Sequence, residues 1–304
     1  MVDFIDAQRE EFGVEPIITV LRSAGVVMAP STYYDAKSRG PSARAQRDAE
    51  LVPALVALWE DNYRVYGARK LWKTARRNGH DVGRDQVGRL MRAAGICGHG
   101  AVNGSRPRSQ MPAARHPDLV KRKFTATAPN QLWVTDLTFV PTWAGVAYAC
   151  FIVDAYSRMI VGWRVAGHMR TSMVLDALRC ALVARKPVGG LEMSLRCWVA
   201  VHLHSLRRTA RRDRRGPSIG SIGDSFDNAL AETVNGYYKA ELIYGPARSG
   251  PWKTVEDVEL ATLSWVFWHN TNRLHGYLND VPPAEFEATF YDAQRSDQHL
   301  VEIQ

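Results

Sequence analysis

The sequence predicts an α/β protein with a mixed sheet, preceded by an all-helical region. The first observation is a change of pattern, because apolar residues recur at helical spacing up to about residue 100 and form strand-like runs from residue 131. The second is that helical stretches follow those runs, as expected for a sheet covered by helices. The third is a composition of 46% apolar and 23% charged residues, which is typical of globular proteins.

Residues 1–47 are predicted to form an N-terminal helical segment. Apolar residues at helical spacing are interrupted near Gly13 and Pro16, resume, and stop before Gly25. A turn then leads into a short helix at Tyr33. A stretch containing Ser, Gly and Pro separates this segment from the next one.

Residues 48–100 are predicted to form a helix-turn-helix-like DNA-binding domain. Asp48 is placed to cap its first helix. A second helix is expected from about Ala68 to Arg77, and a third begins near Arg84 after a turn. Two short helices joined by a turn, the second rich in arginine, are typical of a helix-turn-helix. A three-helix bundle with no role in DNA binding is the alternative.

The positive charge of the chain is concentrated around this domain. Residues 51–130 hold 15 basic and 5 acidic side chains, in a chain whose total net charge is +8. Such a block suggests a polyanionic partner, most simply nucleic acid, and a solvated surface is the alternative. The candidate DNA contacts lie around the exposed side of the third helix: Arg84, Arg89 and Arg92. Residues 101–126 are predicted to be a basic linker.

The second half of the chain carries the predicted sheet. The strand-like runs are 132–140, 146–153 and 158–165. The short connection between the last two favours a hairpin, and the three runs suggest an antiparallel meander. Helices are expected at 172–185, 225–242 and 255–270, and a short strand at 218–222.

Composition also excludes several classes of protein. The longest apolar run, 146–153, is far shorter than the ~20 residues needed to cross a bilayer. The acidic N-terminus differs from the basic start of a signal peptide, so we expect a cytoplasmic protein with no membrane partner. His202 and His204 have no third ligand type at useful spacing for a metal. The cysteines lack zinc-site spacing and are expected to be reduced thiols: Cys97, Cys150, Cys180 and Cys197.

Three residues of the second half are candidates for chemistry. Asp136 lies in the middle of an apolar strand, where a carboxylate is costly unless it is paired or bound to a cation. Glu232 lies on a predicted helix, and Lys239 follows two turns later on the same face. The alternatives are a helix cap or a satisfied structural acid for Asp136 and an ordinary surface side chain for Glu232.

Motifs along the chain resemble a known family. They are LWVTDLT at 132–138, DAYSR at 154–158, GDSFDNALAE at 223–232, and WHN, RLH and PPAEF between 268 and 286. Together they resemble the integrase-type transposases of bacterial insertion sequences, and most closely the second reading frame (OrfB) of insertion-sequence family three. The resemblance covers nearly the whole chain, including the helix-turn-helix-like segment.

This resemblance implies a fold and a reaction. The fold is an RNase-H-like integrase catalytic core, over residues 127–292, followed by a tail at 293–304. The reaction is DNA cleavage and strand transfer by in-line attack on a phosphodiester, at an Asp-Asp-Glu triad that binds two Mg²⁺ (or Mn²⁺) ions. Two such ions suit the reaction because one activates the nucleophile and the other stabilises the leaving oxygen. Carboxylates suit Mg²⁺ because this ion prefers hard oxygen ligands.

The resemblance also assigns roles and partners. By matching positions, Asp136 is the first acid of the triad and Glu232 the third. Lys239 stands where the family has a residue expected to contact DNA phosphate, and Asn228 matches a position near the site. Asp154 is interpreted as a turn residue. The implied partners are DNA, as transposon ends and target, an OrfA-type protein or fusion, and further copies of the chain assembled on DNA.

The second Asp of the triad is absent. Its position, counted back from Glu232, holds Arg196, within a stretch (194–216) that contains seven arginines. Reading the same bases one nucleotide later can restore the family's text, which predicts a compensated double frameshift, whereas a diverged segment is the alternative. Either reading predicts local disorder or poor packing over 193–216.

Two function hypotheses follow from the missing acid. One is an insertion-sequence transposase whose strand transfer is impaired. The other is a catalytically dead protein that binds transposon ends. A DNA-binding regulator of host genes is a third reading, but a regulator has no need for Asp136 and Glu232.

Overall fold

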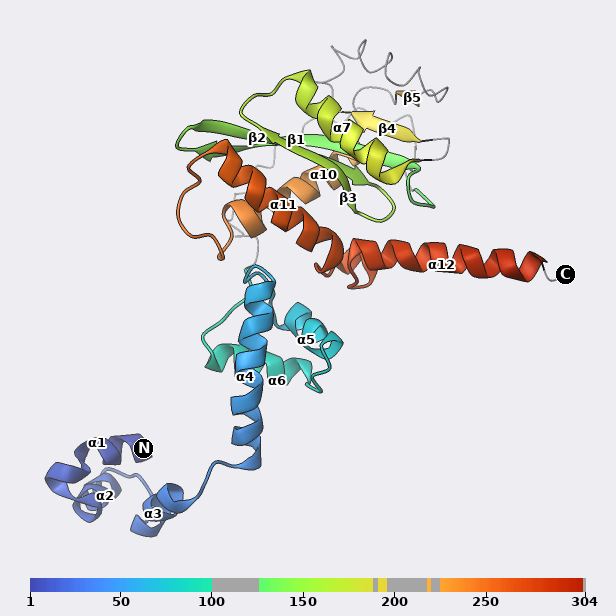
Figure 1. Cartoon of the computed structure of the whole chain (residues 1–304). Coiled ribbons are helices and arrows are strands. Elements are labelled where there is room, and N and C mark those ends of the chain that lie inside the picture. The colour runs from blue at the N-terminus through green and yellow to red at the C-terminus, as the bar shows by residue number, and fades with distance from the viewer. Residues whose placement is uncertain (100–125, 188–190, 196–217, 220–224, 303–304) are drawn as a thin grey trace, which may run out of the picture. The chain divides into compact units, whose positions relative to one another are not determined.

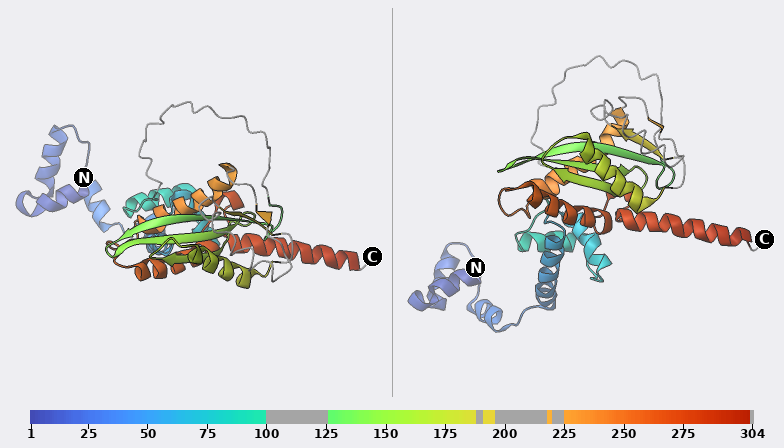
Figure 2. Two further views of the ribbon diagram at one scale, coloured as in Figure 1. Left: turned by 90° about the horizontal axis from the view of Figure 1, so that it is seen from above. Right: turned by 45° about the horizontal axis from the view of Figure 1, so that its top comes forward.

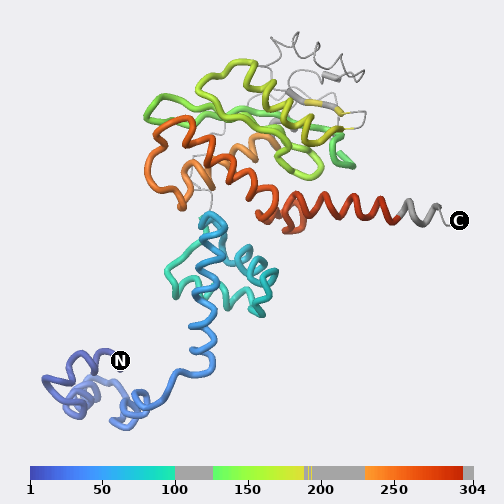
Figure 3. Tube along the Cα trace, in the orientation of Figure 1, coloured from blue at the N-terminus to red at the C-terminus, as the bar shows by residue number. Residues whose placement is uncertain are grey.

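The computed structural model describes residues 1–99, 126–187, 191–195, 218–219 and 225–302 (Figure 1). The chain forms two compact units, Met1–Ala54 and Leu55–Gln304. Figure 3 follows the same path as a tube from the N-terminus to the C-terminus.

Three helices make up most of the first unit: α1 (Val2–Phe12), α2 (Val14–Ser23) and α3 (Pro30–Ser38). Gly13 separates α1 from α2 with a φ of 77°, a backbone conformation that glycine adopts without steric cost. The break predicted at this glycine is therefore confirmed. Ile5, Ile18 and Tyr33 form the centre of a small apolar core.

Helix α4 (Ala43–Asp61) begins earlier than the sequence predicted. The placement of Asp48 as the helix cap is wrong, because Asp48 lies within the helix. The backbone N–H of Ala45 instead donates to the side-chain oxygen of Ser42 (3.2 Å), as at a capped helix N-terminus. Both residues belong to types that cap helices, so the local pattern could not choose between them.

Helix α5 (Ala68–Arg77) has the bounds that the sequence predicted, and α6 (Arg84–Ala93) begins where it was expected. The turn between them is tied to α5, because the indole N–H of Trp72 donates to the carbonyl oxygen of Val82 (2.9 Å). Apolar side chains on both helices are buried: Leu71, Ala75, Val87, Leu90 and Met91.

The sheet of the second unit is mixed, as predicted. Strands β1 (Leu132–Thr142), β2 (Gly145–Asp154) and β3 (Ile160–Ala166) form an antiparallel meander. Strand β4 (Glu192–Leu195) pairs parallel to β1, and β5 (Ser218–Ile219) pairs parallel to β4. The sheet order is β3-β2-β1-β4-β5, which is the RNase-H-like arrangement that the resemblance implied.

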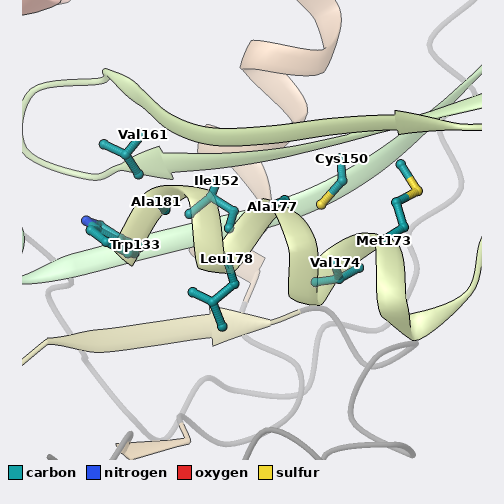
Figure 4. Packing of buried hydrophobic residues seen from close by; sticks show 9 residues of the cluster. All are labelled: Trp133, Cys150, Ile152, Val161, Met173, Val174, Ala177, Leu178 and Ala181. Carbon is teal, nitrogen blue, oxygen red and sulfur yellow. The ribbon is translucent and has the colours of Figure 1, made fainter. Parts of the chain in front are cut away.

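Helices cover both faces of this sheet (Figure 2). Helix α7 (Thr171–Arg185) packs on one face, where Cys150 and Ile152 of β2 point into its core cluster (Figure 4). Phe151 lies between them in the strand and therefore points to the opposite face. There its ring contacts Tyr238 of α10 (Ser225–Tyr238) and Trp265 of α11 (Val255–Thr271).

The sequence predicted one helix over 225–242, and the structure divides it. Helix α10 ends at Tyr238 and continues directly as a π-helical turn, η1 (Lys239–Ile243). After α11 and a short 3₁₀ turn, η2 (Gly276–Leu278), helix α12 spans Pro283–Glu302. Helix α12 passes residue 292 without a break, where the sequence had placed the start of a tail.

The prediction of poor packing over 193–216 is wrong at its first residues. Residues 193–195 belong to β4, and Met193 packs against the core cluster beneath α7. Residues 196–216, with Cys197, His202 and His204, lie outside the described residues, as does most of the predicted linker at 101–126. The three described cysteines are free thiols: Cys97, Cys150 and Cys180. Within the described parts of the chain, no helix is long and apolar enough to span a bilayer.

Candidate active site

Asp136 lies at the centre of the candidate site. It occupies the middle of β1, and only 6% of its surface is exposed. Its carboxylate oxygen Oδ2 accepts a hydrogen bond from the side-chain amide of Asn235 in α10 (2.8 Å). A buried carboxylate without a partner would be strongly destabilising, so this hydrogen bond is part of what allows an acid at this position.

The orientation of the Asn235 amide follows from the chemistry of its partner. An ionised carboxylate only accepts hydrogen bonds, so the NH₂ group of Asn235 must face Asp136. The amide oxygen Oδ1 therefore points elsewhere. It is buried and has no hydrogen-bond partner among the described residues. Near the buried acid there is therefore an amide oxygen that could accept a hydrogen bond or serve as a ligand of a cation.

Glu232 lies on α10, three residues before Asn235. Side chains three residues apart on a helix are neighbours, with Cβ atoms roughly 5–6 Å apart. Glu232 lies in the helical turn just before Asn235. The contact between Asn235 and Asp136 thus anchors this turn to β1. The Glu232 side chain is exposed, whereas Asp136 is buried.

Lys239 begins the π-helical turn that follows α10. Its ammonium nitrogen lies 4.8 Å from the ring centre of Phe139, which follows Asp136 by three residues in β1. The Phe139 ring is exposed, so the Lys239 side chain lies at the protein surface beside β1. Asn228 lies in the first half of α10, and its side chain falls outside the described residues.

Strand β4 pairs with the part of β1 that leads up to Asp136. The parallel register of β1 and β4 ends at Thr135 opposite Leu195. The next residue of β1 is Asp136. Arg196, which follows Leu195 in the sequence, lies outside the described residues.

Asp154 does not supply the third carboxylate. Its Oδ1 accepts hydrogen bonds from the backbone N–H groups of Tyr156 and Ser157, each at 2.9 Å. Its Oδ2 accepts from the backbone N–H of Asn130 (2.6 Å). The interpretation of Asp154 as a turn residue is confirmed. In the described part of the chain, no three acidic, histidine or cysteine side chains gather into a metal-binding group.

The face of the sheet behind Asp136 is apolar. Cys150 lies on the neighbouring strand and is completely buried in the core beneath α7. Burial, reinforced by the negative charge of Asp136, raises the pKa of this thiol to about 12. Cys150 is therefore a neutral core residue and not a nucleophile of the site.

The predicted DNA-contacting arginines all lie on α6. Arg84 is exposed and pairs only weakly with the adjacent, exposed Asp85 (3.1 Å). Arg92 is also exposed, and its Nε donates to the carbonyl oxygen of Gly88 (3.2 Å). Arg89 is half-buried.

The basic residues of α5 are used differently. Arg69 and Lys73 both donate to the same oxygen of Asp280, and the Arg69 contact measures 2.7 Å. Arg77, a further turn along α5, pairs with Glu285. Acids of the C-terminal region thus neutralise one stripe of this helix. The charge count of the sequence overstated the positive surface that this domain presents, because these three cations face carboxylates.

The role of Asn235 at the candidate site was not identified from the sequence, and neither was the buried pair of Glu241 and Arg273. Asn235 could have been found, because it follows Glu232 at helical spacing on the same face. Glu241 and Arg273 meet across 32 positions of the chain, and no local pattern pairs them.

Comparisons with known proteins find matches to both halves of the chain. Family models described as "Integrase core domain" match residues 126–201 and 216–283, and a model described as "HTH-like domain" matches residues 46–100. The putative transposase of insertion sequence IS986/IS6110 from Mycobacterium tuberculosis H37Ra is 49% identical over 278 residues, covering 88% of this chain and 97% of that protein. The transposase of IS629 from Shigella sonnei is 42% identical over 306 residues, covering 98% and 99%.

Among solved structures, this chain matches one from the simian T-cell lymphotropic virus intasome, in its complex with the PP2A regulatory subunit B56 gamma. The TM-score is 0.43 and the sequence identity is 14%. This match covers 73% of this chain and 70% of that chain.

The fold and the matched models define a protein with an integrase core and a helix-turn-helix-like domain before it. The chain belongs to the transposases of bacterial insertion sequences, and the resemblance found in its motifs is confirmed.

Proposed function

We propose that the chain acts on transposon ends and target DNA at a site formed by Asp136 and Glu232, and that these acids hold a divalent cation, Mg²⁺ or Mn²⁺. The residues present fit such an ion, because two carboxylates provide hard oxygen ligands. The buried amide oxygen of Asn235, without a partner among the described residues, adds an oxygen donor beside them. The observation that carries the proposal is the hydrogen bond from Asn235 to Asp136, which anchors α10 to β1.

Each part of the chain has a separate task in this proposal. Asp136 and Glu232 would hold the divalent cation, and two such ions in an intact site would supply charge stabilisation for displacement at phosphorus. Asn235 holds Asp136 in one orientation, and Lys239 binds a DNA phosphate beside the site. Exposed arginines of α6 hold the duplex through its backbone, which makes the affinity depend on salt. The assembly on DNA involves further copies of the chain and an OrfA-type partner.

We further propose that this chain transfers strands poorly or not at all. The triad needs a second Asp, and the family position for it holds Arg196. A guanidinium repels divalent cations and cannot replace a carboxylate ligand. DNA binding uses other residues and is retained, which keeps the catalytically dead end-binding protein as the second candidate.

The experiment uses the full chain and DNA that carries the terminal repeats flanking its own coding sequence. Gel-shift binding to these ends is expected, together with little or no Mg²⁺- or Mn²⁺-dependent strand transfer. A version in which codons 194–216 are read one nucleotide later is expected to gain strand transfer. Adding Asp136→Asn to that version should abolish the gained activity. Robust strand transfer by the unaltered chain would overturn the proposed impairment.

The coding DNA tests the origin of the segment directly. A compensated frameshift requires one insertion or deletion shortly before codon 194 and a second near codon 216, relative to an intact relative. A nucleotide sequence that cannot be read as the family's text in the shifted frame would establish divergence instead.

A further inference from the structure

The C-terminal motif with Arg273 and His275 has no part in the site described so far, yet Arg273 is almost completely buried. Its guanidinium donates to Glu241 from Nε (2.9 and 3.0 Å) and from Nη2 (2.6 Å). Trp265 adds a further hydrogen bond to Glu241 from its indole N–H (3.3 Å). Such a forked, buried contact defines the position of both side chains, because the guanidinium is planar and its donors are fixed relative to one another.

Glu241 is not on an ordinary helix. It lies in the π-helical turn η1, where the N–H of Tyr244 donates to the carbonyl of Lys239 (2.8 Å), five residues back. π-helical turns are rare and are frequent at functional sites. Lys239 is the first residue of this turn. A contact that holds Glu241 therefore also holds the backbone from which the Lys239 side chain extends.

The end of the turn is held in two further ways. A Cβ atom on Gly245 would lie only 1.9 Å from the carbonyl oxygen of Glu241, so no other residue fits there without moving the backbone. The carbonyl oxygen of Ile243 accepts from Arg248 Nη1 (3.1 Å) and from the indole of Trp252 (3.3 Å). The turn is thus fixed at its middle by Arg273 and at its end by the segment that follows.

The surroundings of Arg273 keep its charge in place. Its guanidinium stacks 3.9 Å from the ring centre of Tyr237, and its Nη1 contacts His275 (3.1 Å). Burial opposes the charged form, but the charge and hydrogen bonds of Glu241 raise the pKa of Arg273 above its ordinary value. Burial lowers the pKa of His275, so this ring is neutral and accepts the hydrogen bond.

We propose that Arg273 is a positioning residue of the DNA-processing site: through Glu241 it holds the π-helical turn and so fixes Lys239 beside the strand that carries Asp136. This inference rests on the proposed contact of Lys239 with DNA phosphate. It gives the C-terminal motif a role in placing a DNA contact, in addition to its role in the core.

The test uses the full chain, a duplex DNA of defined sequence and the variants Arg273→Lys, Lys239→Ala and both together. Lysine keeps the positive charge but loses the fork, so Glu241 is not left with an unpaired buried charge. Lys239→Ala is expected to lower the slope of log affinity against log salt by about 1, as for one phosphate contact. Arg273→Lys should weaken binding by a similar factor, and the double variant should bind no more weakly than Lys239→Ala alone.

Hydrogen exchange provides the second measurement. In Arg273→Lys, backbone amides of residues 239–244 should exchange faster while β1–β3 stay protected. Arg164→Lys is the matched control, because the ion pair of Arg164 with Glu259 lies at the surface of the same core, and it should change neither measurement.

The possible failures are distinguishable. Unchanged exchange in the turn, or losses of affinity that add in the double variant, would overturn the role of Arg273 and leave the contact of Lys239 with DNA intact. Unchanged affinity in Lys239→Ala would overturn that DNA contact and the present inference with it. If Arg273→Lys fails to fold, it is replaced by the double variant Glu241→Leu with Arg273→Met. An apolar pair in place of a buried ion pair often preserves stability. DNA affinity equal to that of the unaltered chain would then overturn the inference.

Discussion

Asn235 of α10 and Asp136 of β1 are joined by a buried hydrogen bond of 2.8 Å, across 99 positions of the sequence. This contact connects the two elements that carry the candidate acids. It also orients one carboxylate and leaves the amide oxygen of Asn235 without a partner among the described residues.

Replacing Asn235 by Ala should weaken divalent cation binding. Groups that orient a metal-binding carboxylate typically contribute 10–100-fold to metal affinity, and we expect a loss in that range. Titration of the full chain with Mn²⁺, followed by electron paramagnetic resonance, measures it without requiring activity. Asn272→Ala, at the exposed end of α11, is the control. Equal Mn²⁺ affinity in the two variants would contradict this role.

The α6 arginines should carry much of the affinity for duplex DNA. Replacing Arg84, Arg89 and Arg92 together by Ala should reduce binding at low salt, and the salt slope should fall by about 1 for each phosphate that is no longer neutralised. Fluorescence anisotropy at several salt concentrations measures both quantities. A variant that retains the affinity and slope of the unaltered chain would remove α6 from the DNA interface.

His269 should make the fold sensitive to acid. Burial, followed by the charge of Arg273, lowers the pKa of this ring from 6.5 to about 3. The unfolded chain therefore binds a proton below pH 6.5 that the folded chain binds only near pH 3. Stability is complete above that interval and falls as the pH decreases through it.

His269→Phe should remove this contribution. Urea denaturation between pH 7 and pH 4 is expected to show a shallower decrease in the free energy of unfolding than for the unaltered chain. His168→Phe, at an exposed position, should follow the unaltered chain. Parallel curves for all three proteins would show that His269 is not buried as a neutral ring.

Gly162 should be necessary for the contact between β3 and α7. A Cβ atom at this position would lie 2.4 Å from the carbonyl oxygen of Ala177 and 2.8 Å from the Cβ of Ala181. Gly162→Ala should therefore cost about 1–3 kcal/mol of stability through overpacking. Gly236→Ala is the control, because nothing lies within 4 Å of that position and alanine favours a helix. Thermal unfolding should move the two variants in opposite directions.

Local patterns predicted the elements well where one signal dominated. The bounds of α5 and the start of α6 agree with the prediction because their apolar spacing stops at turn residues. Helix α4 was misjudged because two capping residues, Ser42 and Asp48, compete within six positions. The π-helical turn after Tyr238 contains Glu241, which pairs with Arg273, and such a distant contact leaves no periodic trace in the sequence.

The residues of the candidate site were proposed from the sequence, and the fold adds the contact of Asn235 with Asp136. Asp136 stood out as an acid in an apolar strand, and Lys239 through its spacing from Glu232. The parallel register of β1 and β4, in contrast, could not be predicted from the motifs. It brings Thr135 opposite Leu195, immediately before Asp136 and Arg196.

The pairing of α5 with Asp280 and Glu285 has a consequence for any titration with salt. Asp280 is buried and Glu285 is half exposed, so added electrolyte weakens the Arg77 pair well before the contacts of Arg69 and Lys73. If α6 binds DNA as proposed, the same electrolyte releases the DNA. A change of ionic strength is therefore expected to have two effects on this protein. Moderate salt concentrations weaken DNA binding, and higher concentrations also weaken the ion pairs that join α5 to Asp280 and Glu285.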